Sequence, residues 1–314
     1  MKRSKIHTLF MLASLALVTS CVQSTKGSGD VERDSDSTNT SNTDWQKDLE
    51  SWAGDALNSG KELVEEVGDE IKSIEINSFS VEEDKQLGKQ LYDEIHNSPD
   101  YKVLDRKRYK ALYAYVESIK QTILQNGGLR YGNTFDWDIT ILNDDQTINA
   151  FCAPGGYIFI YTGILKYLEN EAEFAGVLAH EMGHADRRHG TRQMTKSMGI
   201  QMLLDVLTDG ENSRYYGEVI AGLVSLRYSR SYEREADECS VRYLCSTDYT
   251  ADGGAGFFRK ILKEQGEASV ELLSTHPDPG ERVSNFKESK KEMNCSGKEK
   301  YTDRYRAVVA KSLK

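Results

Sequence analysis

The sequence predicts a mainly α-helical domain with one small antiparallel β-sheet, an α+β fold. Apolar residues recur at helical spacing over most of the chain after residue 80, which favours helices. Between residues 135 and 161 this spacing gives way to alternating and continuous apolar runs, which are typical of strands. With 314 residues, the chain is long enough to bury a substantial core around these elements.

Helices are expected on both sides of the strand region. Before it, the apolar spacing predicts helices at 81–97 and 105–126, and Gly127 and Gly128 end the second one. After it, the same spacing predicts helices at 170–190, from there to about 207, and at 215–244, 251–265, 279–293 and 300–313.

Three strands are expected between these helices. The first covers 135–141, where apolar and polar residues alternate. The next two cover 148–153 and 157–161, and Pro154-Gly155-Gly156 separates them. A Pro-Gly-Gly break between two apolar runs predicts a hairpin. We therefore expect the small sheet to precede the helix at 170–190 directly.

The first 44 residues predict export and a lipid anchor. Three basic residues within the first five positions precede a short apolar run, so residues 1–20 have the pattern of a signal peptide. The sequence LVTSC at 17–21 resembles a bacterial lipobox, which would make Cys21 a lipidated N-terminus. In the alternative, an ordinary signal peptide, Cys21 is incidental. Residues 21–44 are rich in small polar side chains and predict a flexible tether after this anchor.

An amphipathic helical segment is expected over 45–76, between the tether and a domain that spans 77–314. Its apolar residues, from Trp45 to Ile74, recur at helical spacing. Packing on the domain is the favoured role, and contact with a membrane or a partner is the alternative. The acidity of the segment argues against binding to anionic lipid.

Charge and cysteine content narrow the function classes. Lys and Arg number 40 and Asp and Glu number 50, which gives a net charge of −10 without a basic cluster. We therefore expect no nucleic-acid partner. Four cysteines follow Cys21, and an oxidising compartment permits disulfides between them. Their pairing stays open, including the option that Cys152 is a buried free thiol. The four are Cys152, Cys239, Cys245 and Cys295.

The chemistry centres on the helix expected at 170–190, which begins with a capping-box pattern at Asn170. It contains the motif His180-Glu181-x-x-His184. Because residues four apart lie on one face of a helix, both imidazoles can bind a single Zn²⁺. Glu181 then lies beside the open metal position, where a carboxylate can act on water as general base.

A catalytic zinc site needs a third protein ligand. Two known patterns are excluded by counting forward from the motif, because Gly190, Leu203 and Leu204 occupy the positions where those patterns place it. Glu233 and Asp237 are better candidates, since a helix presents residues four apart on one face. One carboxylate can bind the metal while the other accepts the N–H of a ligating histidine. Taken alone, the same segment also fits a charged surface helix.

The order of these motifs resembles the HtpX-like and CAAX-prenyl-protease zinc metallopeptidases, family forty-eight, of the gluzincin HExxH type. The resemblance rests on HExxH, on SRSYEREAD at 229–237 and on the hairpin strand, and it covers roughly Val81 to Lys290. It implies a zincin-like domain with one Zn²⁺ per chain. The implied roles are zinc ligation by His180, His184 and Glu233, general base catalysis by Glu181, orientation of a ligand by Asp237, and substrate binding along Asn149, Ala150 and Phe151.

A later motif, His276-Pro277 followed by Arg282, also resembles the family. The resemblance implies that His276 and Arg282 are catalytic, because they stabilise the oxyanion of the reaction. In some periplasmic members the equivalent histidine instead occupies the open zinc position and silences the enzyme. The alternative is a loop histidine beside a proline turn. His189 has no role in the motif and is interpreted as structural.

The implied function is zinc-dependent hydrolysis of peptide bonds by a metalloendopeptidase. HtpX-type members are integral membrane proteins, whereas this sequence resembles the lipoprotein or periplasmic branch, so prenylated substrates are not expected. We expect lipid anchoring on the periplasmic side of the bacterial cell envelope, with envelope proteins or peptides as substrates in protein quality control. The position after Cys21 is Val22 rather than the Asp associated with inner-membrane retention, which favours the outer membrane. The alternative is an assembly or chaperone-like binding factor whose latent zinc site is gated by His276.

Overall fold

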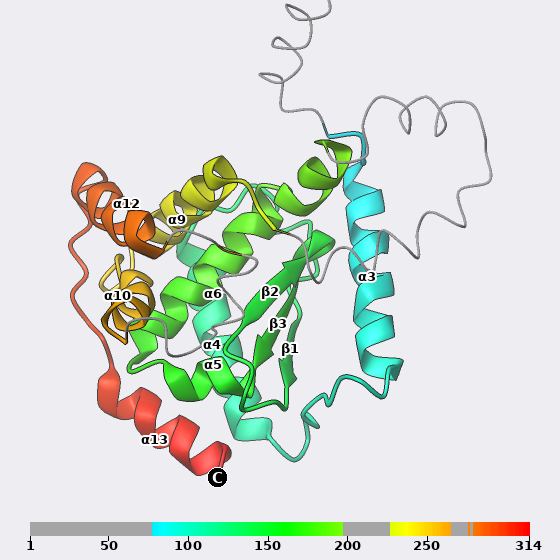
Figure 1. Ribbon diagram of the computed structural model, residues 1–314, viewed down its shortest axis with the longest axis horizontal. Helices are drawn as coiled ribbons and strands as arrows, with labels where there is room; N and C mark the ends of the chain where they lie inside the picture. Colours follow the sequence, from blue (N-terminus) through cyan, green and yellow to red (C-terminus); the bar gives the residue numbers. More distant parts are fainter. Residues whose placement is uncertain (1–76, 197–226, 265–275, 277–278) are drawn as a thin grey trace, which may run out of the picture. The chain divides into compact units, whose positions relative to one another are not determined.

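The computed structural model describes residues 77–196, 227–264, 276 and 279–314 (Figure 1). All of them lie within one compact unit, Asp69–Lys314. The expected signal peptide, Cys21, the tether and the amphipathic segment at 45–76 lie outside the described residues, as do the parts of the expected helices between 197 and 226. No helix in the described part of the chain is long and apolar enough to cross a membrane.

A three-stranded sheet with the order β1-β3-β2 forms the middle of the unit. Its strands are β1 (Ile139–Leu142), β2 (Ala150–Ala153) and β3 (Tyr157–Tyr161). The expected hairpin is confirmed, since β2 and β3 pair antiparallel with Phe151 opposite Phe159. The expectation of a purely antiparallel sheet is wrong, because β1 pairs parallel with β3. The reason is that β3 lies between β1 and β2, which run in opposite directions. Because β3 is antiparallel to β2, it runs parallel to β1.

Backbone conformation explains the bounds of these strands. The first strand begins at Ile139 rather than at 135, because Trp137 has a φ of 47°, which ends extended structure there. In the hairpin, Gly155 and Gly156 have φ values of 76° and 92° within the turn Pro154–Gly156. Side chains other than glycine rarely adopt this left-handed region. The two glycines therefore permit the tight reversal from β2 to β3.

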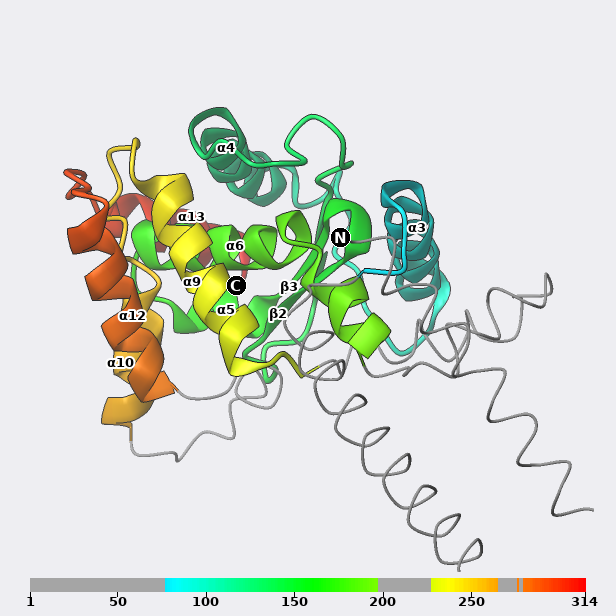
Figure 2. The same ribbon diagram turned by 90° about the horizontal axis from the view of Figure 1, so that it is seen from above.

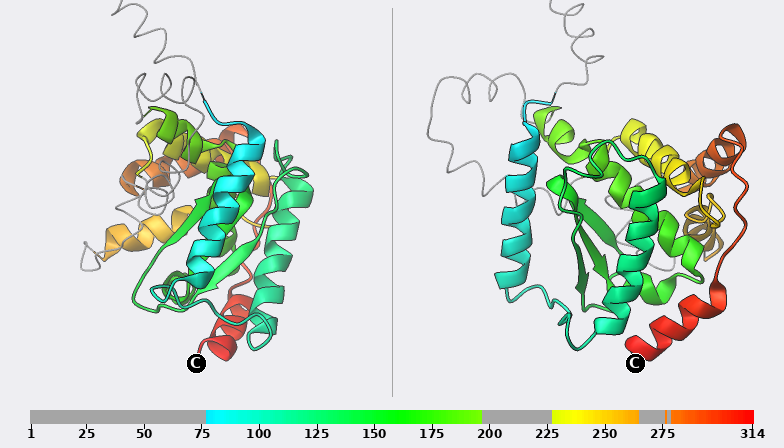
Figure 3. Two further views of the ribbon diagram at one scale, coloured as in Figure 1. Left: turned by 90° about the vertical axis from the view of Figure 1, so that its right-hand side faces the viewer. Right: turned by 180° about the vertical axis from the view of Figure 1, so that it is seen from behind.

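Helices cover both faces of the sheet (Figures 1 and 3). They are α3 (Val81–Asn97), α4 (Lys110–Asn126), α5 (Thr162–Tyr167) and α6 (Glu171–Asp186). On one face, Leu91 and Ile95 of α3 pack in a cluster with Phe151 and Phe159. The other face belongs to the larger core, in which side chains of β1, β2 and β3 pack with those of α4 and α6. Every residue of α6 is buried, so this helix lies inside the unit.

Four further helices enclose α6 from the side away from the sheet (Figure 2). They are α9 (Arg230–Leu244), α10 (Ala255–Lys263), α12 (Pro279–Glu292) and α13 (Thr302–Ser312). α9 lies along α6, and α12 packs against both α9 and α10. The α6–α9 pair is close, because a Cβ placed on Gly183 would lie 3.0 Å from the Cβ of Cys239. This close packing brings side chains of both helices into one cluster.

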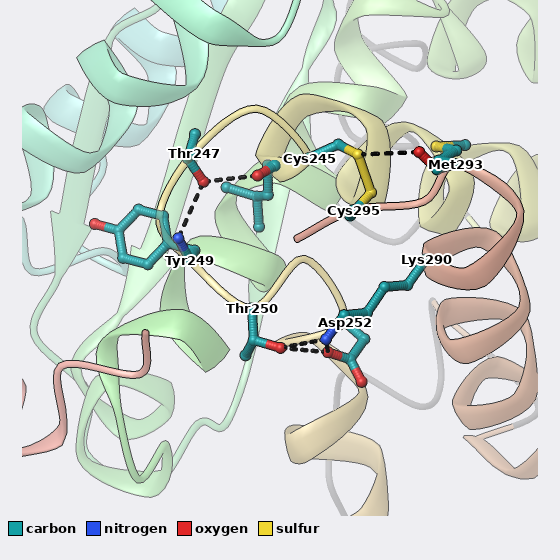
Figure 4. Close-up of a disulfide and its surroundings, with 9 residues drawn as sticks. Cys245, Thr247, Tyr249, Thr250, Asp252, Lys290, Met293 and Cys295 are labelled. Carbon is teal, nitrogen blue, oxygen red and sulfur yellow. Dashed lines mark hydrogen bonds and ion pairs between the residues drawn. A yellow bond between two sulfur atoms is a disulfide. The ribbon is translucent and has the colours of Figure 1, made fainter. Parts of the chain in front are cut away.

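Among the described residues, one disulfide joins the end of α9 to the segment after α12 (Figure 4). It pairs Cys245 with Cys295, which are 50 residues apart in the chain. Cys152 and Cys239 are free and buried, as the alternative for Cys152 foresaw. Beside the disulfide, Lys290 of α12 donates to Asp252 at 2.8 Å. Together, the disulfide and the Lys290–Asp252 contact hold α12, the helix that carries Arg282, close to α9.

Candidate metal centre

α6 places His180 and His184 one turn apart on the same face, as the motif predicts. The helix begins at the predicted cap, where the Asn170 side chain accepts from the backbone N–H of Glu173. The two Nε2 atoms lie 2.9 Å apart, and both imidazoles are buried. Two bare lone pairs at this distance repel, so the contact calls for a proton or a metal cation between the two nitrogens. Burial lowers the pKa of His184 well below its usual range, so its imidazole is neutral, as a metal ligand requires.

Glu233 of α9 completes a set of three donors. Its Oε2 lies 3.5 Å from His180 Nε2, and its Oε1 lies 3.5 Å from His184 Nε2. In a tetrahedral zinc site with bonds of about 2.0–2.1 Å, neighbouring ligand atoms are about 3.3 Å apart. Burial alone would raise the pKa of Glu233, but the neighbouring His276 and the Arg282 guanidinium outweigh this effect and hold the pKa well below its usual range. The carboxylate is therefore ionised, and the three residues fit a metal ion.

His276 is the fourth member of this cluster. One ligand atom from each of the four residues lies within 4.8 Å of the others. His276 Nδ1 lies 2.9 Å from Glu233 Oε1 and 3.5 Å from His180 Nε2, and its Nε2 lies 3.6 Å from Glu181 Oε1. A catalytic metal site keeps one position free of protein ligands. In this arrangement His276 reaches toward that position.

Glu181 lies beside the cluster in an unusual state for a buried carboxylate. Its side chain is 1% exposed, and neither of its oxygens has a hydrogen-bond partner among the described residues. Burial raises the pKa of Glu181, which makes it a stronger base than an exposed glutamate. A buried polar group without a partner costs stability. Such a group is expected where a bound ion, water or substrate completes the site.

Asp237 and Arg282 lie behind the donors. Asp237 Oδ1 is 3.0 Å from His180 Nδ1, which matches the expected role of a carboxylate that orients a ligating histidine. Arg282 of α12 donates from Nε to Asp237 Oδ2 at 3.0 Å and pairs through Nη1 with Glu233 Oε2 at 2.9 Å. Its Nη2 also lies 2.9 Å from His180 Nδ1. Arg282 therefore contacts the residues that would hold a metal, and its predicted contact with an oxyanion stays a prediction.

Two residues lie beside His184 although no pattern in the sequence predicts that they contact it. Tyr228 stacks on the His184 ring, with centroids 3.9 Å apart. His189 Nδ1 lies 2.9 Å from His184 Nδ1. The spacing from His184 to His189 is not helical, because α6 ends at Asp186 and Arg188 has a φ of 58° before a new helical segment begins. A search by helical period therefore misses this contact.

The strand expected to bind substrate lies next to the cluster. Ala150 and Phe151 begin β2, which is the edge of the sheet and contacts α6. Asn149 precedes β2 and is 3% exposed, and its Oδ1 has no hydrogen-bond partner in the part of the chain that the structure describes. Phe151 points to the opposite face, where it stacks on Phe159 at 4.8 Å. At this edge, the outer side of β2 pairs with no strand of the described residues, and a buried acceptor without a hydrogen-bond partner there lies beside it.

This buried set of two histidines and a glutamate, with a second glutamate in an HExxH helix, defines the class of metallopeptidases. The chain belongs to peptidase family M48, whose sequence model matches residues 110–290. The matched part spans α4 to α12 and includes every residue of the cluster. The protein therefore contains an α+β domain of the M48 metallopeptidase family.

Individual relatives share part of this chain. The mitochondrial metalloendopeptidase OMA1 of Arabidopsis thaliana is 34% identical over 46% of this chain and 30% of its own length. A putative beta-barrel assembly-enhancing protease of Vibrio cholerae is 29% identical over 46% of this chain and 33% of its own length. The metalloprotease YcaL of Escherichia coli is 28% identical over 45% of this chain and 58% of its own length. The chain thus covers less than two thirds of each of these relatives.

Proposed function

We propose that this protein is a zinc-dependent metalloendopeptidase of the bacterial cell envelope. His180, His184 and Glu233 would hold one Zn²⁺, and Glu181 would act as general base. The observation that carries the proposal is the buried carboxylate of Glu181, which has no hydrogen-bond partner among the described residues and lies beside three donors spaced for a metal. Such an arrangement supports catalysis rather than a purely structural metal site, because a closed site has no use for a free base.

The residues of the chain divide the work of peptide hydrolysis. When bound, zinc supplies Lewis acidity, which polarises a carbonyl and lowers the pKa of water. Glu181 accepts the proton of the attacking water and then donates it to the leaving amine. The raised pKa of Glu181 helps it to hold this proton between the two steps. Asp237 orients the imidazole of His180, and the buried Nε2 of His276, which makes no hydrogen bond to a described residue and lies 3.6 Å from Glu181 Oε1, would donate to the substrate oxygen.

Substrate would bind in extended form along β2. An edge strand offers its unpaired backbone groups to a peptide, so that the peptide adds a strand to the sheet. Asn149, Ala150 and Phe151 provide this edge, and the free Oδ1 of Asn149 offers one further acceptor for a substrate N–H. This mode recognises backbone more than side chains, which suits a protease that cleaves unfolded proteins.

The cell envelope is the proposed location. The signal-peptide pattern and the lipobox at Cys21 would place the protein on the periplasmic side of a membrane, with the outer membrane favoured by Val22. The Cys245–Cys295 disulfide is compatible with an oxidising compartment. Relatives in Yersinia pestis and Escherichia coli are named beta-barrel assembly-enhancing protease. We therefore propose misfolded or unassembled envelope proteins as substrates.

The decisive experiment compares the native protein with Glu181→Gln. We expect equal zinc content by elemental analysis and loss of cleavage of an unfolded protein substrate, because Gln keeps the shape of the side chain but cannot accept the proton. A comparison of envelope peptides from cells that carry either form then identifies substrates. Full activity of Glu181→Gln would overturn the mechanism. Unchanged peptide profiles would count against a role in general protein turnover.

A second candidate function is favoured by the position of His276. Its Nδ1 lies among the donor atoms, 2.9 Å from Glu233 Oε1, so this side chain can close the metal site. The protein would then be an envelope assembly or chaperone-like binding factor with a latent, gated protease site. We expect His276→Ala to raise proteolysis if the histidine closes the site. A loss of cleavage with zinc retained would instead assign His276 to the oxyanion.

A further inference from the structure

His189 is completely buried next to the proposed metal centre, although the catalytic scheme does not use it. Its ring stacks on that of Tyr232, with centroids 4.4 Å apart and planes 17° from parallel. This stacking fixes the plane of the imidazole and leaves its two nitrogens to point in opposite directions. One nitrogen faces His184, and the other faces Glu235 of α9.

A chain of hydrogen bonds runs through this ring. His189 Nε2 lies 3.1 Å from Glu235 Oε2, and His189 Nδ1 lies 2.9 Å from His184 Nδ1. An ionised carboxylate only accepts, so Nε2 of His189 carries the proton of the neutral ring. The Nδ1 atom of His189 is then an acceptor, and the Nδ1–H of His184 donates to it. Consequently, Nε2 of His184 keeps a bare lone pair on the side of the cluster.

We propose that Glu235 and His189 form a relay that fixes the tautomer and orientation of His184, so that its Nε2 is ready to bind the metal. Both are positioning residues, because they act through His184. This inference rests on the proposed metal site. It also explains why α9 carries three acidic residues at alternate positions, of which Glu233 faces the donors while Glu235 and Asp237 each support one histidine.

The two ligating histidines would be supported in different ways. His180 contacts Asp237 directly, at 3.0 Å, and the side chain of Asp237 is fully buried. His184 reaches its carboxylate only through His189, and the side chain of Glu235 is 33% exposed. Arg187 Nε holds the other oxygen of Glu235 at 3.3 Å. The relay therefore extends from the buried centre to the surface, where Glu235 can be changed without opening the core.

The first test substitutes Glu235. In Glu235→Gln, the amide N–H can donate to His189 Nε2, so His189 carries its proton on Nδ1 and donates it to His184 Nδ1. The direction of the hydrogen bonds is then reversed, and the proton of His184 lies on Nε2. We expect ¹⁵N NMR of the metal-free protein to show loss of the single His184 tautomer, and zinc affinity, measured by competition with a chelator, to fall about 10- to 100-fold. Glu235→Asp should restore both. Glu238→Gln removes the same charge from an exposed position of α9, where Glu238 pairs with Arg234, and serves as matched control.

The second test substitutes His189. His189→Phe keeps a ring to stack on Tyr232 but removes the acceptor, so we expect zinc affinity to fall as in Glu235→Gln. His189→Asn keeps an acceptor near Nδ1 and should lose less. An unchanged tautomer and unchanged zinc affinity in Glu235→Gln would overturn the relay. If the native protein and the Glu238→Gln control bind no zinc, the proposed function fails instead, and the tautomer of His184 in metal-free protein still tests the relay separately.

Discussion

Two glutamates of α6, Glu171 and Glu181, are each 1% exposed but have opposite surroundings. Both oxygens of Glu171 accept hydrogen bonds. Tyr115 of α4 donates to Oε2 at 2.6 Å, Tyr249 donates to Oε1 at 2.5 Å, and Arg304 of α13 donates to Oε2 at 2.6 Å. Neither oxygen of Glu181 has a hydrogen-bond partner in the described part of the chain, and His276 Nε2 lies 3.6 Å from its Oε1.

The comparison separates burial that holds the fold from burial that serves chemistry. Glu171 lies in the first turn of α6, where the helix dipole also favours a negative charge, and its partners tie α4, the loop after α9 and α13 to this helix. All of its hydrogen-bonding capacity is used at one end of the helix. Glu181 loses its contact with water on burial, and no hydrogen bond from the described residues compensates for this loss. A side chain kept in such a state is expected at a reactive site.

The largest expected effect comes from exchanging each carboxylate for its amide. We expect Glu181→Gln to lose peptide cleavage about 10²- to 10⁴-fold, the usual contribution of a general base, while its unfolding midpoint in chelator stays the same or rises. Glu171→Gln should show the reverse, with a lower midpoint and activity retained below it. Peptide cleavage and urea unfolding of the two variants measure both. A loss of stability in Glu181→Gln equal to that in Glu171→Gln would remove the distinction.

Local features of α6 and of the hairpin could be predicted from the sequence. The Asn170 cap, the shared face of His180 and His184, and the reversal at Gly155 depend on contacts within a few residues of the chain. The helical period also predicted that Glu233 and Asp237 share a face of α9. Resemblance to a family was needed to bring α9 and His276 to α6, because helical spacing says nothing about which helices pack together.

The remaining features depend on packing between distant segments. In the sequence, Glu171 is an acidic residue in the first turn of a helix like many others. Its partner Arg304 is 133 positions away, so no local pattern indicates their contact. The parallel pairing of β1 follows from the insertion of β3, which no local pattern encodes. His189 contacts His184 only because the chain turns at Arg188. These features arise from tertiary structure, so the pattern of a single segment could not reveal them.

The next largest effect is on stability. Glu171→Ala leaves one buried and one partly buried tyrosine hydroxyl and a guanidinium without their acceptor, and we expect it to lower the free energy of unfolding by about 3 kcal/mol. Arg304→Ala should cost less than about 1 kcal/mol, because the Arg304 side chain is 51% exposed and water replaces its contact. Urea unfolding in chelator measures both values. Equal losses in the two variants would show that the ion pair, rather than the tyrosines, anchors Glu171.

The smallest effect concerns stability at alkaline pH. Burial and the hydrogen bond to Glu171 raise the pKa of Tyr115 and of Tyr249 above the ordinary value of about 10. The stability that each tyrosine contributes is therefore complete below pH 10, and it is lost as the pH rises because only the unfolded chain releases the proton. Above pH 10, each should lower the free energy of unfolding by up to about 1.4 kcal/mol per pH unit. Urea unfolding of Tyr115→Phe and Tyr249→Phe between about pH 8 and 11 should show a shallower decline than in the native protein, and parallel curves would mean that the two hydroxyls ionise freely in the folded state.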